Sequence, residues 1–340
     1  MGSLGVAAFP AGPAEIVAVL PRVELSMKVG QAIGEEGSMV FDGSAGIVLD
    51  TARRSTMIPV EATVSREGSR AVQHYRVEVA RNARETPTFL RLVLLQVLEV
   101  AGGSSDDVTA TVVVETRYGN GRSVRLQDSI HAGRAGFFGP GADSINPMVG
   151  KLLDDLLRPL GNSFERLDLD SVRASITTVP RRQSAVVRRA WVNEQRLKAG
   201  AMATVFVELR PFGEPGSIRA LTFRVPDEAA GQELEVKVAA GPSVRPEGAP
   251  PERLDDLLEL VRTRYTSRDL VLVVGVPGRA LQYRGRVLRR LPACVLPLLD
   301  APNTSRVLSM PLTVRAIDRT PWVLEGECSV RVPVKEVAIE

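Results

Sequence analysis

The sequence predicts a mainly β protein, an antiparallel β-barrel remnant plus a β-sandwich, with three amphipathic or buried helices. Strict alternation of apolar and polar residues runs through many short segments, residues 60–64 and 234–238 among them. Successive side chains of a strand point to opposite faces, so each such run is typical of a half-buried strand in an antiparallel sheet. Three longer segments have helical periodicity instead.

Residues 1–85 are the first predicted unit, a β segment of alternating strands. Residues 86–162 form the second unit, a helix, a β-hairpin and a helix. The first helix begins at Thr86-Pro87 and is apolar on nearly every side, which predicts burial between layers. Asn120-Gly121 readily adopts the positive φ angles of a type I′ turn and therefore predicts the hairpin. The second helix follows Asn146-Pro147 and places Asp154 and Asp155 on its solvated face.

Residues 163–241 predict an Ig-like β-sandwich, since strands and turns alternate about every 8 to 12 residues. The Gly- and Pro-rich segment 241–251 reads as a linker or long loop. Residues 251–340 form the last unit, a C-terminal α+β segment that opens with the third helix after Pro250-Pro251. Its acidic residues lie early and Arg262 and Arg264 lie late, which suits the helix dipole.

The composition is that of an ordinary globular protein, with 44% hydrophobic and 24% charged residues and a net charge of +3. The charges are interleaved, and nucleic-acid proteins usually cluster theirs on one face. The densest basic run, Arg181, Arg182, Arg188 and Arg189 ahead of Trp191, therefore predicts a solvated strand face. We expect a protein partner and no nucleic acid.

No apolar stretch reaches the roughly 20 residues that span a bilayer, so we expect no membrane span. The N-terminal residues lack the basic region of a signal peptide, so the localisation stays open from the chain alone. The two cysteines, Cys294 and Cys328, lack metal-site spacing. Cys328 reads as a buried small hydrophobe, and a disulfide between the two stays open.

A hydrolase needs a nucleophile, a base and an orienting group. The only histidines are His74 and His131. His74 lies on the polar side of an alternating run and is expected to face solvent. His131 precedes the glycine-rich segment 133–141 and is the single candidate for a catalytic base, without an identifiable partner. Ser44, in Asp-Gly-Ser-Ala-Gly, is more simply part of a turn than a nucleophile elbow. We therefore expect no catalytic residue, no cofactor and no metal.

Several stretches resemble one family in their order and spacing. The matching stretches are Ala18-Val19-Leu20-Pro21-Arg22-Val23-Glu24-Leu25-Ser26-Met27-Lys28-Val29, Met57-Ile58-Pro59-Val60, Tyr75-Arg76-Val77-Glu78-Val79 with Thr86-Pro87, Trp191-Val192, Leu209-Arg210-Pro211-Phe212, and Leu291-Pro292. They look like the C-terminal, non-catalytic region of large bacterial relatives of stage IV sporulation protein B, the SpoIVB serine-peptidase family. The resemblance covers most of the chain.

In that family the nucleophile lies in a Ser-Gly-Ser-Pro segment, and a Gly-His-Pro-Phe segment precedes a stretch like the start of this chain. Neither segment is present, so the resemblance transfers no catalytic residue. It implies that residues 1–85 correspond to the last strands of a trypsin-like barrel, and that Met1 is an internal methionine or the start of a separated piece. It also implies an exported parent protein, hence the periplasm or cell surface.

Three functions follow as alternatives. The first is a non-catalytic accessory region that supports substrate or partner binding by a SpoIVB-type peptidase. The second is an independent β-sandwich module of the cell envelope. The third is part of an active serine endopeptidase whose catalytic residues lie in a missing N-terminal region. We expect no catalytic activity from the chain alone, and substrate, partner and oligomeric state stay open.

Overall fold

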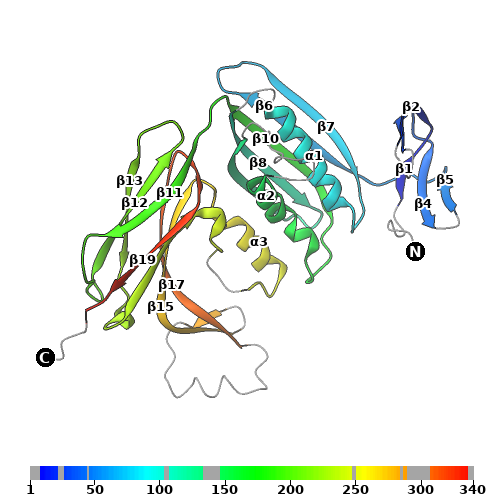
Figure 1. Cartoon of the computed structure of the whole chain (residues 1–340). Coiled ribbons are helices and arrows are strands. Elements are labelled where there is room, and N and C mark those ends of the chain that lie inside the picture. The colour runs from blue at the N-terminus through cyan, green and yellow to red at the C-terminus, as the bar shows by residue number, and fades with distance from the viewer. Residues whose placement is uncertain are drawn as a thin grey trace.

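The computed structural model describes residues 8–21, 27–43, 46–102, 107–132, 146–246, 250–283, 286–288 and 307–335. Within them the chain forms an N-terminal pair of small sheets, a central sheet covered by helices, and a β-sandwich (Figure 1). The predicted fold class is confirmed: the protein is mainly β with three α-helices, and one of its antiparallel sheets curls like half a barrel.

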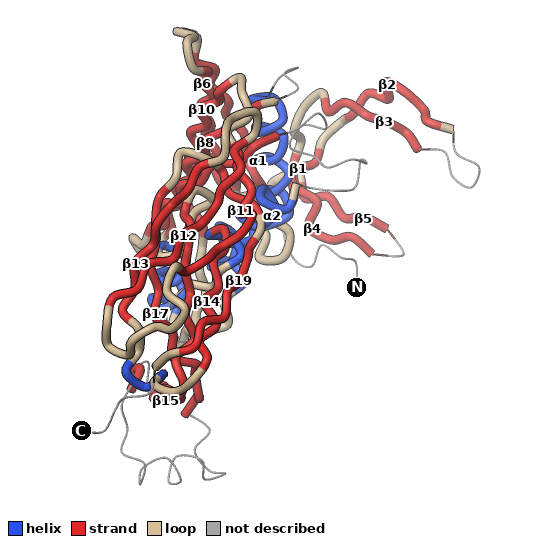
Figure 2. The backbone as a smooth tube through the Cα atoms, turned by 60° about the vertical axis from the view of Figure 1, so that its left-hand side comes forward, coloured by secondary structure: helices blue, strands red, loops and turns tan. Residues whose placement is uncertain are grey.

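The N-terminal β region, residues 8–50, consists of two separate sheets that project beyond α1 (Figures 1 and 2). One sheet has the order β1-β4-β5, and in the other β2 pairs with β3, both antiparallel. The strands are β1 (Phe9–Ala11), β2 (Ala14–Leu20), β3 (Met27–Ala32), β4 (Gly37–Gly43) and β5 (Gly46–Asp50).

The central sheet has five strands in the order β7-β6-β10-β8-β9. They are β6 (Met57–Arg66), β7 (Val72–Ala80), β8 (Val108–Tyr118), β9 (Ser123–Ala132) and β10 (Leu169–Val179). β10 lies parallel to β6 and antiparallel to β8, so it joins two antiparallel hairpins into one sheet. The β8–β9 hairpin turns at Asn120-Gly121 as predicted, with Gly121 at a φ of 79°.

Three helices cover the apolar face of the central sheet (Figure 1). They are α1 (Thr86–Gly102), α2 (Pro147–Leu157), which continues into η1 (Arg158–Gly161), and α3 (Leu254–Arg262). Asn146 caps α2, because its side-chain oxygen accepts a hydrogen bond of 3.0 Å from the Met148 amide. Leu90, Leu94 and Leu98 of α1 are almost fully buried, and Leu92 is exposed.

The β-sandwich has its own core between two sheets. The first has the order β13-β12-β11-β18; the second has the order β16-β15-β14-β19, with β17 paired to β15. Their strands are β11 (Ser184–Val192), β12 (Met202–Pro211), β13 (Ser217–Arg224), β14 (Glu233–Ala240), β15 (Asp269–Tyr283), β16 (Arg286–Leu288), β17 (Val307–Arg319), β18 (Val323–Glu325) and β19 (Glu327–Pro333), with short helical turns η2 (Asp227–Ala229) and η3 (Gly241–Ser243).

The two cores divide the chain differently from the predicted segments. Within 163–241, β10 belongs to the central sheet and β11–β14 to the sandwich. Within 251–340, α3 packs on the central core, whereas β15 and β17–β19 belong to the sandwich. Residues 57–80, predicted as part of the 1–85 unit, likewise belong to the central sheet, where β7 is an edge strand and β6 lies beside it. The chain therefore crosses between the two cores at 179–184, 240–254 and 262–269.

Candidate protein-docking surface

The N-terminal β region exposes its apolar side chains. Every residue of β2 is exposed, and so are Gly46 to Leu49 of β5. Neither hydrophobic core contains a residue of this region. Its large apolar side chains with exposures from 47% to 64% are Ile16, Val17, Val19, Leu20, Ile33, Phe41, Ile47, Val48 and Leu49.

The local sequence of β2 explains why this exposure is unusual. Residues 16–20 are apolar without alternation, a pattern typical of a strand covered on both faces. In the described structure β2 pairs only with β3, and the pair forms a separate two-stranded sheet. Such a pair is marginal in water, and its outer edges offer unpaired backbone groups to another strand. Both its edges and its faces are therefore suited to binding another polypeptide.

Phe9 connects the N-terminal β region to the central part. Its ring meets the ring of Phe89 of α1 edge-to-face, with centroids 6.0 Å apart and planes at 89°. Phe89 packs against the central core. The region is thus anchored at β1, while β2, β3 and β5 present their apolar residues outward.

The second notable site is a polar joint between the central part and the sandwich. Asp128 of β9 accepts hydrogen bonds of 2.8 Å from the backbone amides of Ser129 and Ser267. Arg264 donates to the same carboxylate at 2.6 Å, and both side chains are 7% exposed. Arg268 donates to Ser129 Oγ at 2.9 Å and to the Pro321 carbonyl of the sandwich at 2.7 Å. Charge-assisted hydrogen bonds therefore link the two parts.

Asp155 of α2 is buried, with its side chain 8% exposed. The prediction that it lies on the solvated face of the helix is therefore wrong. It accepts hydrogen bonds from Lys151 at 3.3 Å and Arg158 at 3.1 Å, and Arg264 lies 3.6 Å away. Packing of α3 against η1 and β9 covers this part of α2, so a carboxylate that would be solvated on an isolated helix is buried and surrounded by cations.

His131 lies in this joint. Its Nε2 is hydrogen-bonded to the carboxylate of Glu325 at the end of β18, and its side chain is 10% exposed. The hydrogen bond from His131 holds the pKa of Glu325 below the ordinary 4.5, against the opposing effect of partial burial. His131 Nδ1 is buried without a hydrogen-bond partner among the described residues. Ser129 Oγ, two residues away, is bonded to Thr111 and Arg268 instead.

This geometry differs from that of a hydrolase triad. A triad needs a hydroxyl on one ring nitrogen and a carboxylate on the other, and the pair must reach a substrate. His131 has the carboxylate, yet no described hydroxyl bonds its second nitrogen, and the ring is buried between two domains. The sequence carried no signal for Glu325 as its partner, since the two residues are 194 positions apart.

The other sequence candidates lie apart from one another. His74 is exposed on β7 opposite Thr63, on the solvent side that the alternation predicts. Cys328 is half-buried against the sandwich core, and burial raises the pKa of its thiol. Ser44 and Cys294 lie outside the described residues.

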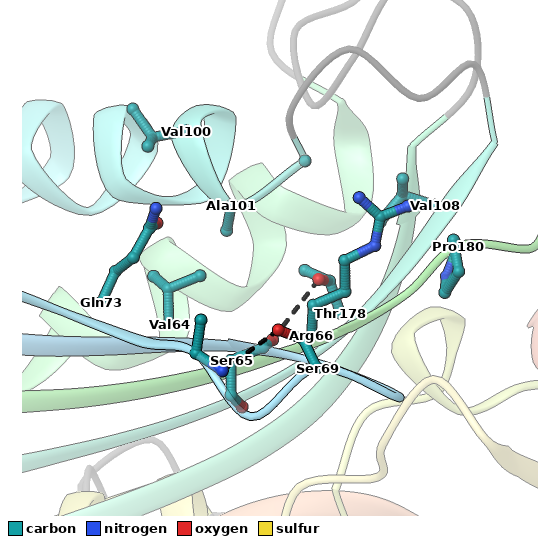
Figure 3. A pocket seen from close by; sticks show the side chains of 12 residues that line it. Val64, Ser65, Arg66, Ser69, Gln73, Val100, Ala101, Val108, Thr178 and Pro180 are labelled. Atoms are coloured by element: carbon teal, nitrogen blue, oxygen red, sulfur yellow. Dashed lines mark hydrogen bonds between the residues drawn. The ribbon is translucent and has the colours of Figure 1, made fainter.

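A cavity of about 230 Å³ lies between the C-terminal end of α1 and the β6–β7 turn (Figure 3). Val100 and Ala101 of α1 face it from one side, and Arg66 and Ser69 from the other. Among the described residues that line it, Arg66 is the only ionisable one.

The described ranges contain no group of three or more His, Cys, Asp or Glu side chains placed to hold a metal ion. None of the helices described is long and apolar enough to cross a membrane.

In comparisons with known proteins, no protein-family model, curated protein or solved structure matches the chain.

Proposed function

We propose that the chain is a non-catalytic accessory region that binds a protein partner through its N-terminal β region. The partner we propose is the peptidase domain of a SpoIVB-type serine peptidase, on the sequence resemblance. The exposed apolar strands β2 and β5 carry the proposal, because neither core needs them and water is a poor solvent for them. The same resemblance leads us to expect the chain in the periplasm or at the cell surface.

Partner binding would supply the missing cover for these strands. Fully burying a large aliphatic side chain contributes about 1.5–3 kcal/mol, so covering the exposed half of each contributes about 1 kcal/mol. Ile16, Val17 and Val19 alone are 53% to 56% exposed. A β-rich partner would also pair with the free strand edges and satisfy their backbone groups.

Binding to a separately produced SpoIVB-type peptidase domain tests this proposal. We expect a one-to-one complex in size-exclusion chromatography with light scattering. The double variant Ile16→Lys/Val19→Lys should weaken the complex at least tenfold, because it places two charges in the proposed contact. Both positions lie outside the cores, so the circular dichroism and unfolding midpoint should stay unchanged.

The matched control is Leu92→Lys/Ile317→Lys, since these side chains are 59% and 55% exposed on other parts of the surface. We expect it to bind like the wild type. Absence of a complex with the wild type, or equal weakening by both double variants, would contradict the proposal.

A second function, an independent β-sandwich module, is favoured by one observation. The sandwich core is closed by strands of residues 184–335 without any residue of the N-terminal β region. A wild-type chain that stays monomeric and does not bind the peptidase domain would support this alternative. The mixture of the chain with the peptidase domain also tests the third alternative, part of an active serine endopeptidase. Peptidase activity that depends on the chain would support that alternative.

A further inference from the structure

The outer face of the sandwich sheet β11–β12–β13 lies at the opposite end of the molecule from the N-terminal β region (Figure 1). Val205, Val207 and Leu209 of β12 are fully buried, so the alternating residues Phe206 and Glu208 project outward. Their outward cross-strand neighbours are given by the register. We call this surface the arginine–aromatic face; it comprises Val186, Arg188, Arg189, Trp191, Met202, Phe206, Glu208, Arg210, Ile218 and Arg224.

A β-bulge concentrates charge on this face. The pairing of β11 with β12 shifts between Val187 and Arg189, which leaves Arg188 as the extra residue. A bulge re-aims the side chain of the additional residue, and both Arg188 and Arg189 are exposed. Two consecutive arginines on one strand therefore reach solvent, where regular alternation would bury one of them.

The positive charges of the face are only partly neutralised. Glu208 is the single carboxylate that projects from these three strands on this side, and it pairs with Arg189 at 2.6 Å. Glu325 of the neighbouring strand β18 lies beside Val186 in the register, and its carboxylate contacts His131. Arg224 lies 4.0 Å from Asp227 at the sheet margin. No carboxylate in the described part of the chain lies within 4.0 Å of Arg188 or Arg210.

The outer face of the second sandwich sheet, which contains β14 and β19, has no such excess of positive charge. There Lys237 pairs with Glu327 at 2.7 Å, and Arg331 lies opposite Glu235 in the register. Glu233 is a further acidic residue of β14. Charges of both signs alternate on that sheet, so it offers no comparable attraction to an acidic partner.

Apolar side chains lie between the arginines. Val186, Met202 and Ile218 are 41%, 66% and 62% exposed. The ring of Trp191 contacts two neighbouring side chains. Phe206 stacks on it with centroids 5.9 Å apart, and the Arg189 guanidinium lies 5.1 Å from its centroid. Since base stacking on an aromatic platform needs an open ring face, this arrangement suits aliphatic side chains better than nucleobases.

We infer that the arginine–aromatic face binds an acidic polypeptide segment in which carboxylates are interspersed with aliphatic side chains. Each free guanidinium offers two parallel N–H groups to a carboxylate, and this bidentate geometry is the strongest that an arginine forms with such a partner. Val186, Met202 and Ile218 receive the aliphatic side chains. This inference does not depend on the proposed function of the N-terminal β region.

Fluorescence anisotropy of a labelled peptide tests the inference on the full chain. The probe is fluorescein-labelled Gly-Glu-Leu-Glu-Ser-Glu-Leu-Glu-Gly, and the comparison probes are the same peptide with lysine for each glutamate and a single-stranded oligothymidylate. We expect saturable binding of the acidic peptide only, weakened by salt. The variant Arg188→Glu/Arg210→Glu should raise its Kd at least tenfold.

The matched control is Arg76→Glu/Arg331→Glu, which changes the net charge equally at exposed arginines of β7 and β19. It should keep the Kd within twofold of the wild type. Failure of the acidic peptide to bind, or equal loss in both double variants, would overturn the inference. Tighter binding of the oligothymidylate, lost in Arg188→Glu/Arg210→Glu, would also overturn it and identify the face as a nucleic-acid surface.

Discussion

Removing Arg264 tests how much the buried ion pairs of the polar joint stabilise the fold. Its guanidinium is 7% exposed and lies 2.6 Å from Asp128 of β9 and 3.6 Å from Asp155 of α2. Arg264→Met keeps much of the aliphatic side chain and removes the charge. Two buried carboxylates then lose a shared cation.

The expected loss of unfolding free energy follows from what each carboxylate retains. Breaking a buried ion pair by removing one partner costs about 3–5 kcal/mol. Asp128 keeps the amides of Ser129 and Ser267, and Asp155 keeps Lys151 and Arg158. We therefore expect the lower end, about 3 kcal/mol, which is a large part of the roughly 5–15 kcal/mol that stabilises a typical protein.

Urea denaturation followed by circular dichroism measures this loss. The control is Arg166→Met, because Arg166 is 85% exposed and its pair with Asp168 at 3.2 Å should contribute less than about 1 kcal/mol. Adding Asp128→Asn to Arg264→Met should cost less than the sum of the single changes, since no unpaired charge then remains on that side chain. A loss for Arg264→Met as small as that for Arg166→Met would refute the reasoning.

Three other predictions concern the joint, the hairpin and the central core. Because the pKa of Glu325 in the folded state lies below its ordinary value of 4.5, ionised Glu325 stabilises the fold above pH 4.5, and this stabilisation is lost as the pH falls through the folded-state pKa. His131→Ala should therefore make the unfolding free energy depend less steeply on pH in the acid range. An unchanged pH dependence would contradict the role of the pair. Gly121 has a φ of 79°, so Gly121→Ala should lower the unfolding free energy by about 1 kcal/mol, and calorimetry that finds no decrease in Tm would count against the turn. Leu98 is 2% exposed and Leu92 is 59% exposed; Leu98→Ala should cost about 2–5 kcal/mol in denaturation and Leu92→Ala almost nothing, whereas equal costs would mean that α1 packs through another face.

Patterns within a few residues of one another specified the local structure. The predicted first helix corresponds to α1 at Thr86–Gly102, and Asn146-Pro147 marks the start of α2. The hairpin at Asn120-Gly121 lies where the turn chemistry places it. Capping, turn geometry and periodicity act between neighbouring residues, so a sequence expresses them directly.

Alternation also predicted the faces of strands but not their partners. Residues 60–64 read as a half-buried strand, yet only the folded sheet places β10 parallel beside β6. A period of two fixes the buried face and leaves open which strand lies alongside. The predicted segment 163–241 therefore groups β10 of the central sheet with β11–β14 of the sandwich.

The sequence by itself determined the mainly β class, the three helices and the absence of a recognisable catalytic motif. Only the tertiary structure decided that Asp155 is buried, that His131 faces Glu325 and that the apolar strand β2 has no covering layer in the described part of the chain. The physical reason is that burial and ion pairing depend on which distant segments meet, and the free energy of that meeting is a property of the whole packing arrangement.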